Sequence, residues 1–150
     1  MASPIKEARQ AIIESSPESG VYVGCDSQRY KKNGMWYARY ATVIVLHKDG
    51  NKGGRMFVDV VTIPDYGSLK QRMLSEVAYA VQHASDIVDV VGDRQFQIHL
   101  DINQSPKHKS NIALKEATGY VLGTFGFAPI AKPDGWCASH ASDHLVRIMG

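Results

Sequence analysis

One turn-forming run, at residues 49–54, constrains the fold more than any other stretch of this 150-residue sequence. The run reads Asp-Gly-Asn-Lys-Gly-Gly and separates two segments, 36–47 and 55–63, that are rich in β-branched and aromatic residues, as strands are. A connection of this length is too short to cross over a sheet, so the two strands are expected to pair antiparallel as a hairpin. The chain therefore contains a sheet that is at least partly antiparallel.

A strand is also expected before this hairpin, at residues 20–26. Its apolar residues alternate with others at the period of a strand whose two faces differ. The apolar run stops at Asp26, and residues 31–34 read as a turn into the next strand. We therefore expect a carboxylate at or near the carboxyl end of the first strand, where α/β sheets usually place their chemistry. Taken alone, Asp26 is better explained as a turn-capping residue.

The rest of the chain alternates between helical and strand patterns. An amphipathic helix is expected at 4–15, and Ser68 is a plausible N-cap for a long helix that ends before Gly92. Segments 95–102 and 127–131 read as strands, and segments 110–122 and 136–149 read as helices. The predicted order is a helix followed by β-β-β-α-β-α-β-α, in a single domain over 1–150 with residues 1–19 as N-terminal helix and connector.

Composition excludes several classes of protein. The hydrophobic share of 44% and the charged share of 21% are those of an ordinary globular domain. No apolar run approaches the roughly 18 residues of a membrane span, and Glu7 and Arg9 interrupt any signal-like segment, so a cytoplasmic location is expected. Cys25 and Cys137 are too few for a disulfide framework and are expected as buried free thiols. The net charge of +2 does not by itself indicate nucleic-acid binding.

Two further acids stand at informative places. Glu76 shares or borders the apolar face of the long helix that follows Ser68. A glutamate at the edge of such a face can simply reach solvent, but an ionised carboxylate buried there needs a partner. Asp101 comes at the end of the alternating strand 95–102.

The order of elements resembles that of the ribonuclease H-like fold, an α/β fold with a five-stranded mixed sheet flanked by helices. In that fold the first and fourth strands are central neighbours, so the resemblance implies that Asp26 and Asp101 lie side by side. It also implies that Glu76, and Asp143 on the terminal helix, complete an acidic cluster.

Such a cluster has a chemical consequence. Carboxylates gathered in one cleft repel one another unless cations neutralise them. Two Mg²⁺ or Mn²⁺ ions roughly 4 Å apart would do so and would suit phosphoryl chemistry. The resemblance thus implies a metal-dependent nuclease with catalytic, metal-binding acids Asp26, Glu76, Asp101 and Asp143. It leaves open whether the substrate is RNA, DNA, a hybrid or a small nucleotide.

The sequence more closely resembles the YkuK-type family of ribonuclease H-like proteins. The resembling pieces are Val-Gly-Cys-Asp-Ser-Gln at 23–28, His-Leu-Asp-Ile-Asn at 99–103, and the segment 128–143. The last piece contains both Asp134 and Asp143, so we expect Asp143 to be the terminal acid and keep Asp134 as the second choice for a metal ligand. The family resemblance supplies the fold and an acidic site, without a substrate.

Polar and basic residues flank the expected site and are candidates for substrate contact. A nucleic-acid strand would need cations for its phosphates and polar groups near the acids. Such runs are also common on solvated surfaces. The candidates are Gln28, Arg29, Asn103, Lys107 and Lys109, with His108 between the two lysines.

Parts of the sequence are also compatible with other functions. Cys137, His140 and His144 have the spacing of zinc ligands on a helix, but a zinc peptidase would need a further ligand downstream. A Cys25 nucleophile is disfavoured because Cys25 is expected to point into packing. The main alternative is a non-catalytic module that uses the same scaffold to bind a nucleic acid, a nucleotide or a protein.

Overall fold

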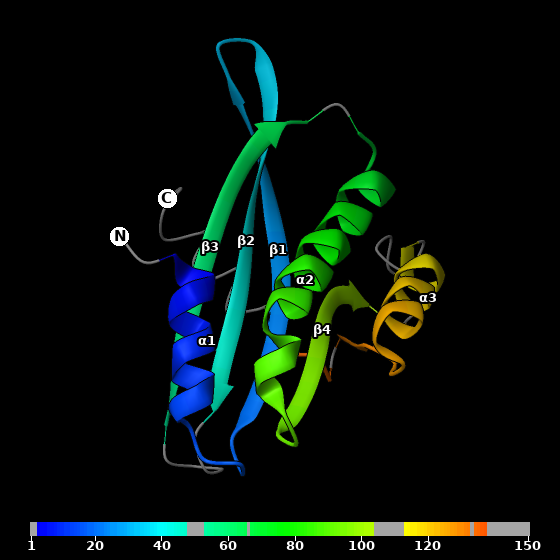
Figure 1. Ribbon diagram of the computed structural model, residues 1–150. Coiled ribbons are helices and arrows are strands. Elements are labelled where there is room, and N and C mark those ends of the chain that lie inside the picture. The colour runs from blue at the N-terminus through cyan, green and yellow to red at the C-terminus, as the bar shows by residue number, and fades with distance from the viewer. Residues whose placement is uncertain (1–2, 48–52, 66, 104–112, 133, 138–150) are drawn as a thin grey trace.

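A five-stranded mixed sheet forms the centre of the computed structural model, which describes residues 3–47, 53–65, 67–103, 113–132 and 134–137 (Figure 1). The strand order is β3-β2-β1-β4-β5. The helices are α1 (Pro4–Glu14), α2 (Leu69–Val91) and α3 (Leu114–Phe125), and the strands are β1 (Gly20–Lys32), β2 (Met35–His47), β3 (Gly54–Pro64), β4 (Gln95–Asn103) and β5 (Ile130–Lys132).

The predicted topology is confirmed. β2 pairs antiparallel with both β1 and β3, as the short connections require. β1 pairs parallel with β4, and β4 pairs parallel with β5, so the first and fourth strands are neighbours. The last expected helix, at 136–149, lies almost entirely outside the described residues.

The end of β1 differs from the expectation. The strand does not stop at Asp26 but continues to Lys32, and a two-residue turn at Asn33 and Gly34, with φ of 52° and 80°, leads into β2. Pairing with β2 extends along all of β1, whereas pairing with β4 covers only Gly20 to Gly24. The polar residues after Asp26 therefore belong to a strand but not to the hydrophobic core.

The outer part of the hairpin formed by β1 and β2 therefore has no neighbour in β4. We call residues 27–39 the distal hairpin. β3 accompanies β2 as far as Tyr37, where Pro64 is its partner, and the tip of the hairpin extends beyond the rest of the sheet (Figure 1). Asp26 thus lies at the base of a projecting hairpin.

The core lies mainly between the sheet and two helices. α1 and α2 lie against the same face of the sheet (Figure 1), and α2 begins at Ser68, whose Oγ accepts a hydrogen bond from the Gln71 amide at 3.2 Å. Alternate residues of β1 and β4 face these helices, and a smaller cluster around Tyr22 lies on the other face. The largest buried core residues on the helical side are Ile12, Val21, Val23, Ile44, Leu46, Ile87, Ile98, Ile102 and Val121.

Two later elements differ from the prediction in their bounds. The helix expected at 110–122 is observed as α3 from Leu114, and the strand expected at 127–131 is observed as β5 from Ile130. Within the described part of the chain, no helix combines the length and the apolar character that crossing a membrane requires.

Candidate metal centre

Three carboxylates from three different elements meet where β1 separates from β4. Asp26 of β1, Glu76 of α2 and Asp101 of β4 each offer one oxygen, and these oxygens lie within 4.8 Å of one another. Asp26 is 8% exposed and Glu76 is 3% exposed, and the side chain of Asp101 is 14% exposed. The group combines high negative charge with limited contact with water.

The register of the sheet brings two of these acids together. Parallel pairing of β1 with β4 ends at Gly24 opposite His99, and the same register continued by two residues sets Asp26 beside Asp101. Both residues alternate with the side chains that face α2, so they belong to the opposite face of the sheet. Glu76 comes from the helical side and reaches them where the two strands no longer pair.

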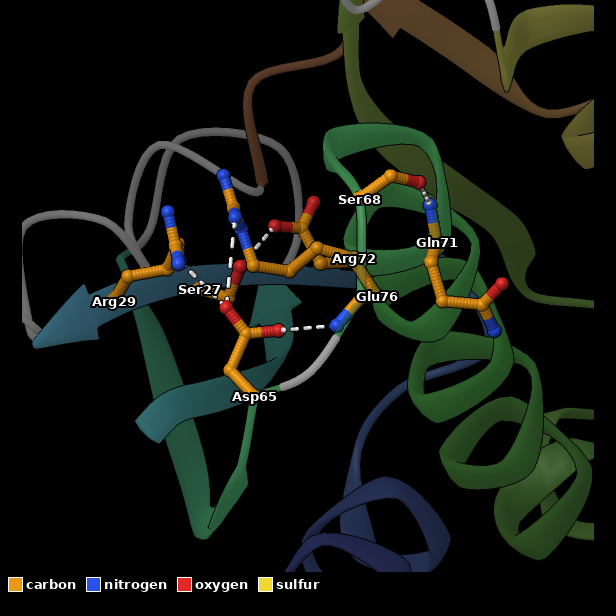
Figure 2. Close-up of polar contacts among 8 residues, drawn as sticks. Ser27, Arg29, Asp65, Ser68, Gln71, Arg72 and Glu76 are labelled. Carbon is orange, nitrogen blue, oxygen red and sulfur yellow. Dashed lines mark hydrogen bonds and ion pairs between the residues drawn. The ribbon is translucent and has the colours of Figure 1, made fainter. Parts of the chain in front are cut away.

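Glu76 is held by a neighbour on β1. The Ser27 hydroxyl donates a hydrogen bond of 2.5 Å to Glu76 Oε2, and Figure 2 shows the two side chains meeting between β1 and α2. Burial raises the pKa of Glu76 well above its ordinary value of 4.5, and the negative charges of Asp26 and Asp101 raise it further. The Ser27 hydrogen bond and the charge of Arg72 act in the opposite direction but do not cancel these effects.

One lysine partly neutralises the acidic group. Lys132, at the end of β5, forms an ion pair with Asp101 Oδ1. Burial acts to lower the pKa of Lys132, but Asp101, Asp26 and Glu76 together raise it above its ordinary value. The ammonium therefore stays charged, and it leaves the group of three acids with a net negative charge.

A second charged group lies next to the acids on the helical side. Asp65, in the β3–α2 connection, accepts a 2.5 Å contact from Arg29 Nε and lies 3.8 Å from a terminal nitrogen of Arg72 (Figure 2). The Asp65 side chain is only 6% exposed. Arg72 is one helical turn before Glu76 in α2, so Asp65 holds two arginines beside the acidic group.

The other predicted site residues are distributed as follows. Gln28 and Arg29 follow Asp26 on β1, with Gln28 partly buried and Arg29 exposed. Asn103 is the last residue of β4, where its backbone pairs with Lys132. Asp134 is exposed in the turn after β5 and is not part of the three-carboxylate group. Asp143, Lys107 and Lys109, together with His108, lie outside the described residues.

Sequence reasoning missed three charged residues at this site. Arg72 could have been found, because it lies four positions before Glu76 and therefore on the same side of the helix. Lys132 is the last residue of the short strand β5, and no pattern in the sequence marks it as a partner of Asp101. Asp65 is a loop residue whose partners, Arg29 and Arg72, become neighbours only through the fold.

The cysteines do not provide an alternative catalytic centre. Both are free and buried, as predicted. Burial raises the pKa of Cys25 well above its ordinary value and raises the pKa of Cys137 to about 12, so both remain protonated thiols at neutral pH. The Cys137 thiol donates to the Val43 carbonyl. His140 and His144, the other proposed zinc ligands, lie outside the described residues.

A buried histidine fixes the chain near the site. Nδ1 of His99 accepts hydrogen bonds from the backbone amides of Trp136 and Cys137 at 3.1 and 3.0 Å. Because Nδ1 is the acceptor, the ring proton is on Nε2, which donates to Gln97 Oε1 at 2.9 Å. His99 thus attaches the segment after β5 to β4, two residues before Asp101.

Comparisons with known proteins agree with this architecture. A family model described as "Ribonuclease H-like" matches residues 4–147. The chain is similar to the "Uncharacterized protein YkuK" of Bacillus subtilis (strain 168), with 26% identity over 160 residues that cover 95% of this chain and 89% of that protein. No solved structure matches the chain significantly.

Proposed function

This chain belongs to the ribonuclease H-like family, and we propose that it is a divalent-metal-dependent nuclease that hydrolyses phosphodiester bonds. The predicted resemblance to the YkuK-type proteins of that family is confirmed. The observation that supports the proposal is the convergence of Asp26, Glu76 and Asp101, with their oxygens within 4.8 Å of one another.

The donor set fits Mg²⁺ or Mn²⁺. All three side chains offer carboxylate oxygens, the ligands that hard divalent cations prefer, and no histidine or cysteine belongs to the group that the described residues form. The buried Glu76 supplies a second argument, because its ionised form needs more positive charge than Lys132 and Arg72 provide. When bound, such cations polarise a phosphate and lower the pKa of an attacking water.

The residues of the chain have distinct proposed roles. Asp26 and Asp101 would hold the cations from the two central strands. Glu76 would hold the cation nearer the leaving oxygen, and Ser27 keeps its carboxylate oriented through the 2.5 Å hydrogen bond. Asp143 is the proposed acid on the water-activating side, with Asp134 as the second choice.

Contacts to the substrate are proposed for residues around the acids. Arg29 is the best supported, because Asp65 holds its guanidinium beside the Ser27–Glu76 pair. Gln28 and Asn103 are proposed to orient the strand, and Lys107 and Lys109 are proposed phosphate contacts. The partner is therefore a nucleic acid, and the proposed location of the reaction is the cytoplasm.

Cleavage of labelled RNA, DNA and RNA/DNA hybrid in the presence of Mn²⁺ tests the proposal. The wild-type protein should cleave at least one of them, and Asp101→Asn should lower the rate by ~100-fold or more, because one of the charges that organise the reaction is removed. Asp93→Asn is the matched control, since Asp93 is an exposed acid in the α2–β4 turn. It should cleave at the wild-type rate.

Two outcomes would contradict the nuclease. One is the absence of cleavage of all three substrates by a folded protein, which would favour the alternative of a binding module on the same scaffold. The other is cleavage that survives in Asp101→Asn, which would place the reaction away from the three carboxylates.

A further inference from the structure

The distal hairpin carries positive charge without any acid. Its cationic residues are Arg29, Lys31, Lys32 and Arg39, and no aspartate or glutamate occurs between Asp26 and Asp49. The protein as a whole has a net charge of only +2, so this concentration is local. A projecting, purely cationic hairpin attracts a polyanion and directs it toward the base of the hairpin.

Aromatic rings are interleaved with these cations. Trp36 is 42% exposed, and the Arg29 guanidinium lies 4.3 Å from the centroid of its ring. Lys31, the cross-strand partner of Trp36, has its ammonium 6.0 Å from the same centroid. Because Asp65 also binds Arg29, this group is held in place on the side of the sheet that faces α2.

A second aromatic group lies on the other face. Tyr30 and Tyr37 are cross-strand partners whose rings stack at 5.6 Å with an interplanar angle of 22°, and the Arg39 guanidinium lies 5.0 Å from the Tyr30 centroid. Tyr30 shares its face with Gln28 and Asp26, since alternate residues of a strand point the same way. At about 3.3 Å per residue, Tyr30 is roughly 13 Å along the strand from Asp26, a span that a few nucleotides cover.

We propose that the distal hairpin is a binding arm for a single-stranded nucleic acid and that it leads the strand toward the three carboxylates. Cations bind the phosphates, and the rings of the exposed Trp36 and of the partly buried tyrosine pair stack on bases. Bases in a duplex are already stacked inside the helix, whereas those of a single strand are free to stack on Trp36 and on the tyrosine pair. That the arm leads the nucleic acid toward the carboxylates rests on the proposed function. The binding of single-stranded nucleic acid by the arm does not depend on it.

Fluorescence anisotropy of the full-length protein in EDTA tests binding in the absence of hydrolysis. The probes are a labelled single-stranded oligonucleotide and the duplex of the same length. The wild-type protein should bind the single strand more tightly, and Trp36→Ala should weaken that binding by ~10-fold through loss of one stacking contact. Trp36→Tyr retains a ring and should recover most of the affinity, which separates stacking from damage to the hairpin.

Charge is tested with a matched pair of double variants. Lys31→Glu/Lys32→Glu removes two cations from the distal hairpin, and Lys6→Glu/Lys115→Glu makes the same change of net charge at exposed positions on α1 and α3. The hairpin variant should bind less tightly, with the slope of log K against log salt reduced by about 1.4. Tyr120→Ala, at an aromatic residue that is 47% exposed on α3, is the control for Trp36→Ala.

The possible results distinguish this inference from the nuclease itself. Equal effects of the hairpin variants and their controls, or tighter binding of the duplex, would overturn the arm even if the protein cleaves nucleic acid. Binding that depends on the hairpin in a protein that cleaves nothing would support the arm and overturn the proposed nuclease.

Discussion

Glu76 is both the most buried of the three carboxylates and a proposed metal ligand. Its pKa is raised by burial and by the neighbouring acids, so in the metal-free protein the folded state binds its proton more tightly than the unfolded state does. The free energy of unfolding therefore falls as the pH rises from the ordinary pKa of 4.5 toward the raised value. A divalent cation beside Glu76 would offset this loss, because positive charge favours the ionised carboxylate.

Replacing this charge should stabilise the metal-free protein. In EDTA at neutral pH, Glu76→Gln should raise the melting temperature by ~3 °C or more, because the amide can still accept the Ser27 hydrogen bond without repelling Asp26 and Asp101. The gain should shrink as the pH is lowered toward the ordinary pKa of 4.5, because protonation of Glu76 in the folded wild-type protein removes the repulsion. Differential scanning calorimetry across this pH range measures both effects.

The control for this variant is Glu18→Gln, which removes an exposed carboxylate in the α1–β1 connection. It should leave the melting temperature unchanged. A Glu76→Gln protein that is less stable than the wild type in EDTA at neutral pH would show that the carboxylate is satisfied without metal and would contradict this account of Glu76.

His99 gives a second pH dependence at the residue scale. Burial lowers the pKa of His99 to about 4, below its ordinary 6.5, so the unfolded state takes up a proton first as the pH falls. Stability from this group is therefore complete above pH 6.5 and is lost between pH 6.5 and about 4, by up to ~3 kcal/mol. Ring ¹⁵N chemical shifts should show a proton on Nε2 throughout that range. Titration of His99 near pH 6.5, or a proton on Nδ1, would contradict the hydrogen bonds to Trp136 and Cys137.

At the scale of elements, α2 positions the site through its first turns. Ser68 caps the helix, and Arg72 and Glu76 follow on one side of it, so the cap helps to fix the residues that reach the acids (Figure 2). Ser68→Ala should lower the free energy of unfolding by ~1 kcal/mol, measured by urea denaturation, while Ser68→Asp should retain most of the stability. An alanine variant as stable as the wild type would mean that the cap contributes nothing.

The sequence predicted the elements well where the core determines them. β4 alternates strictly because one of its faces packs against helices, and α2 shows an apolar face for the same reason. The end of β1 was predicted wrongly because Ser27 to Lys32 pair with β2 outside the core, and apolar periodicity does not report such pairing. Local turn chemistry contained the missing signal, since Asn33 and Gly34 form the two-residue turn that hairpins favour.

The candidate site was also predictable only in part. The resemblance to the ribonuclease H-like fold predicted the approach of Asp26 to Asp101, because the first and fourth strands are neighbours in that fold, as they are here. The placement of Lys132 and Asp65 depends on how a short edge strand and a loop pack, and neither has a periodic pattern. Side-chain partners of this kind are set by tertiary structure, so the residues nearest to the acids were partly missed.

At the scale of the whole molecule, the hydrophobic core and the candidate site occupy different parts of the sheet. α1 and α2 cover one face and bury most of the core, and the distal hairpin projects beyond the rest of the sheet (Figure 1). The acids lie at the base of this hairpin, where β1 no longer pairs with β4. The cationic hairpin and the acidic group are thus neighbours along one strand. In the proposed function, the hairpin attracts the nucleic acid, and the carboxylates would hold the cations that bind its phosphates.

The claim that the three carboxylates bind divalent cations is tested most directly by anomalous X-ray diffraction from crystals grown with Mn²⁺. Crystals of the wild-type protein should show manganese peaks bounded by Asp26, Glu76 and Asp101, and crystals of Asp26→Asn should lose them. Crystals that diffract well and show no manganese among these three side chains would contradict the account.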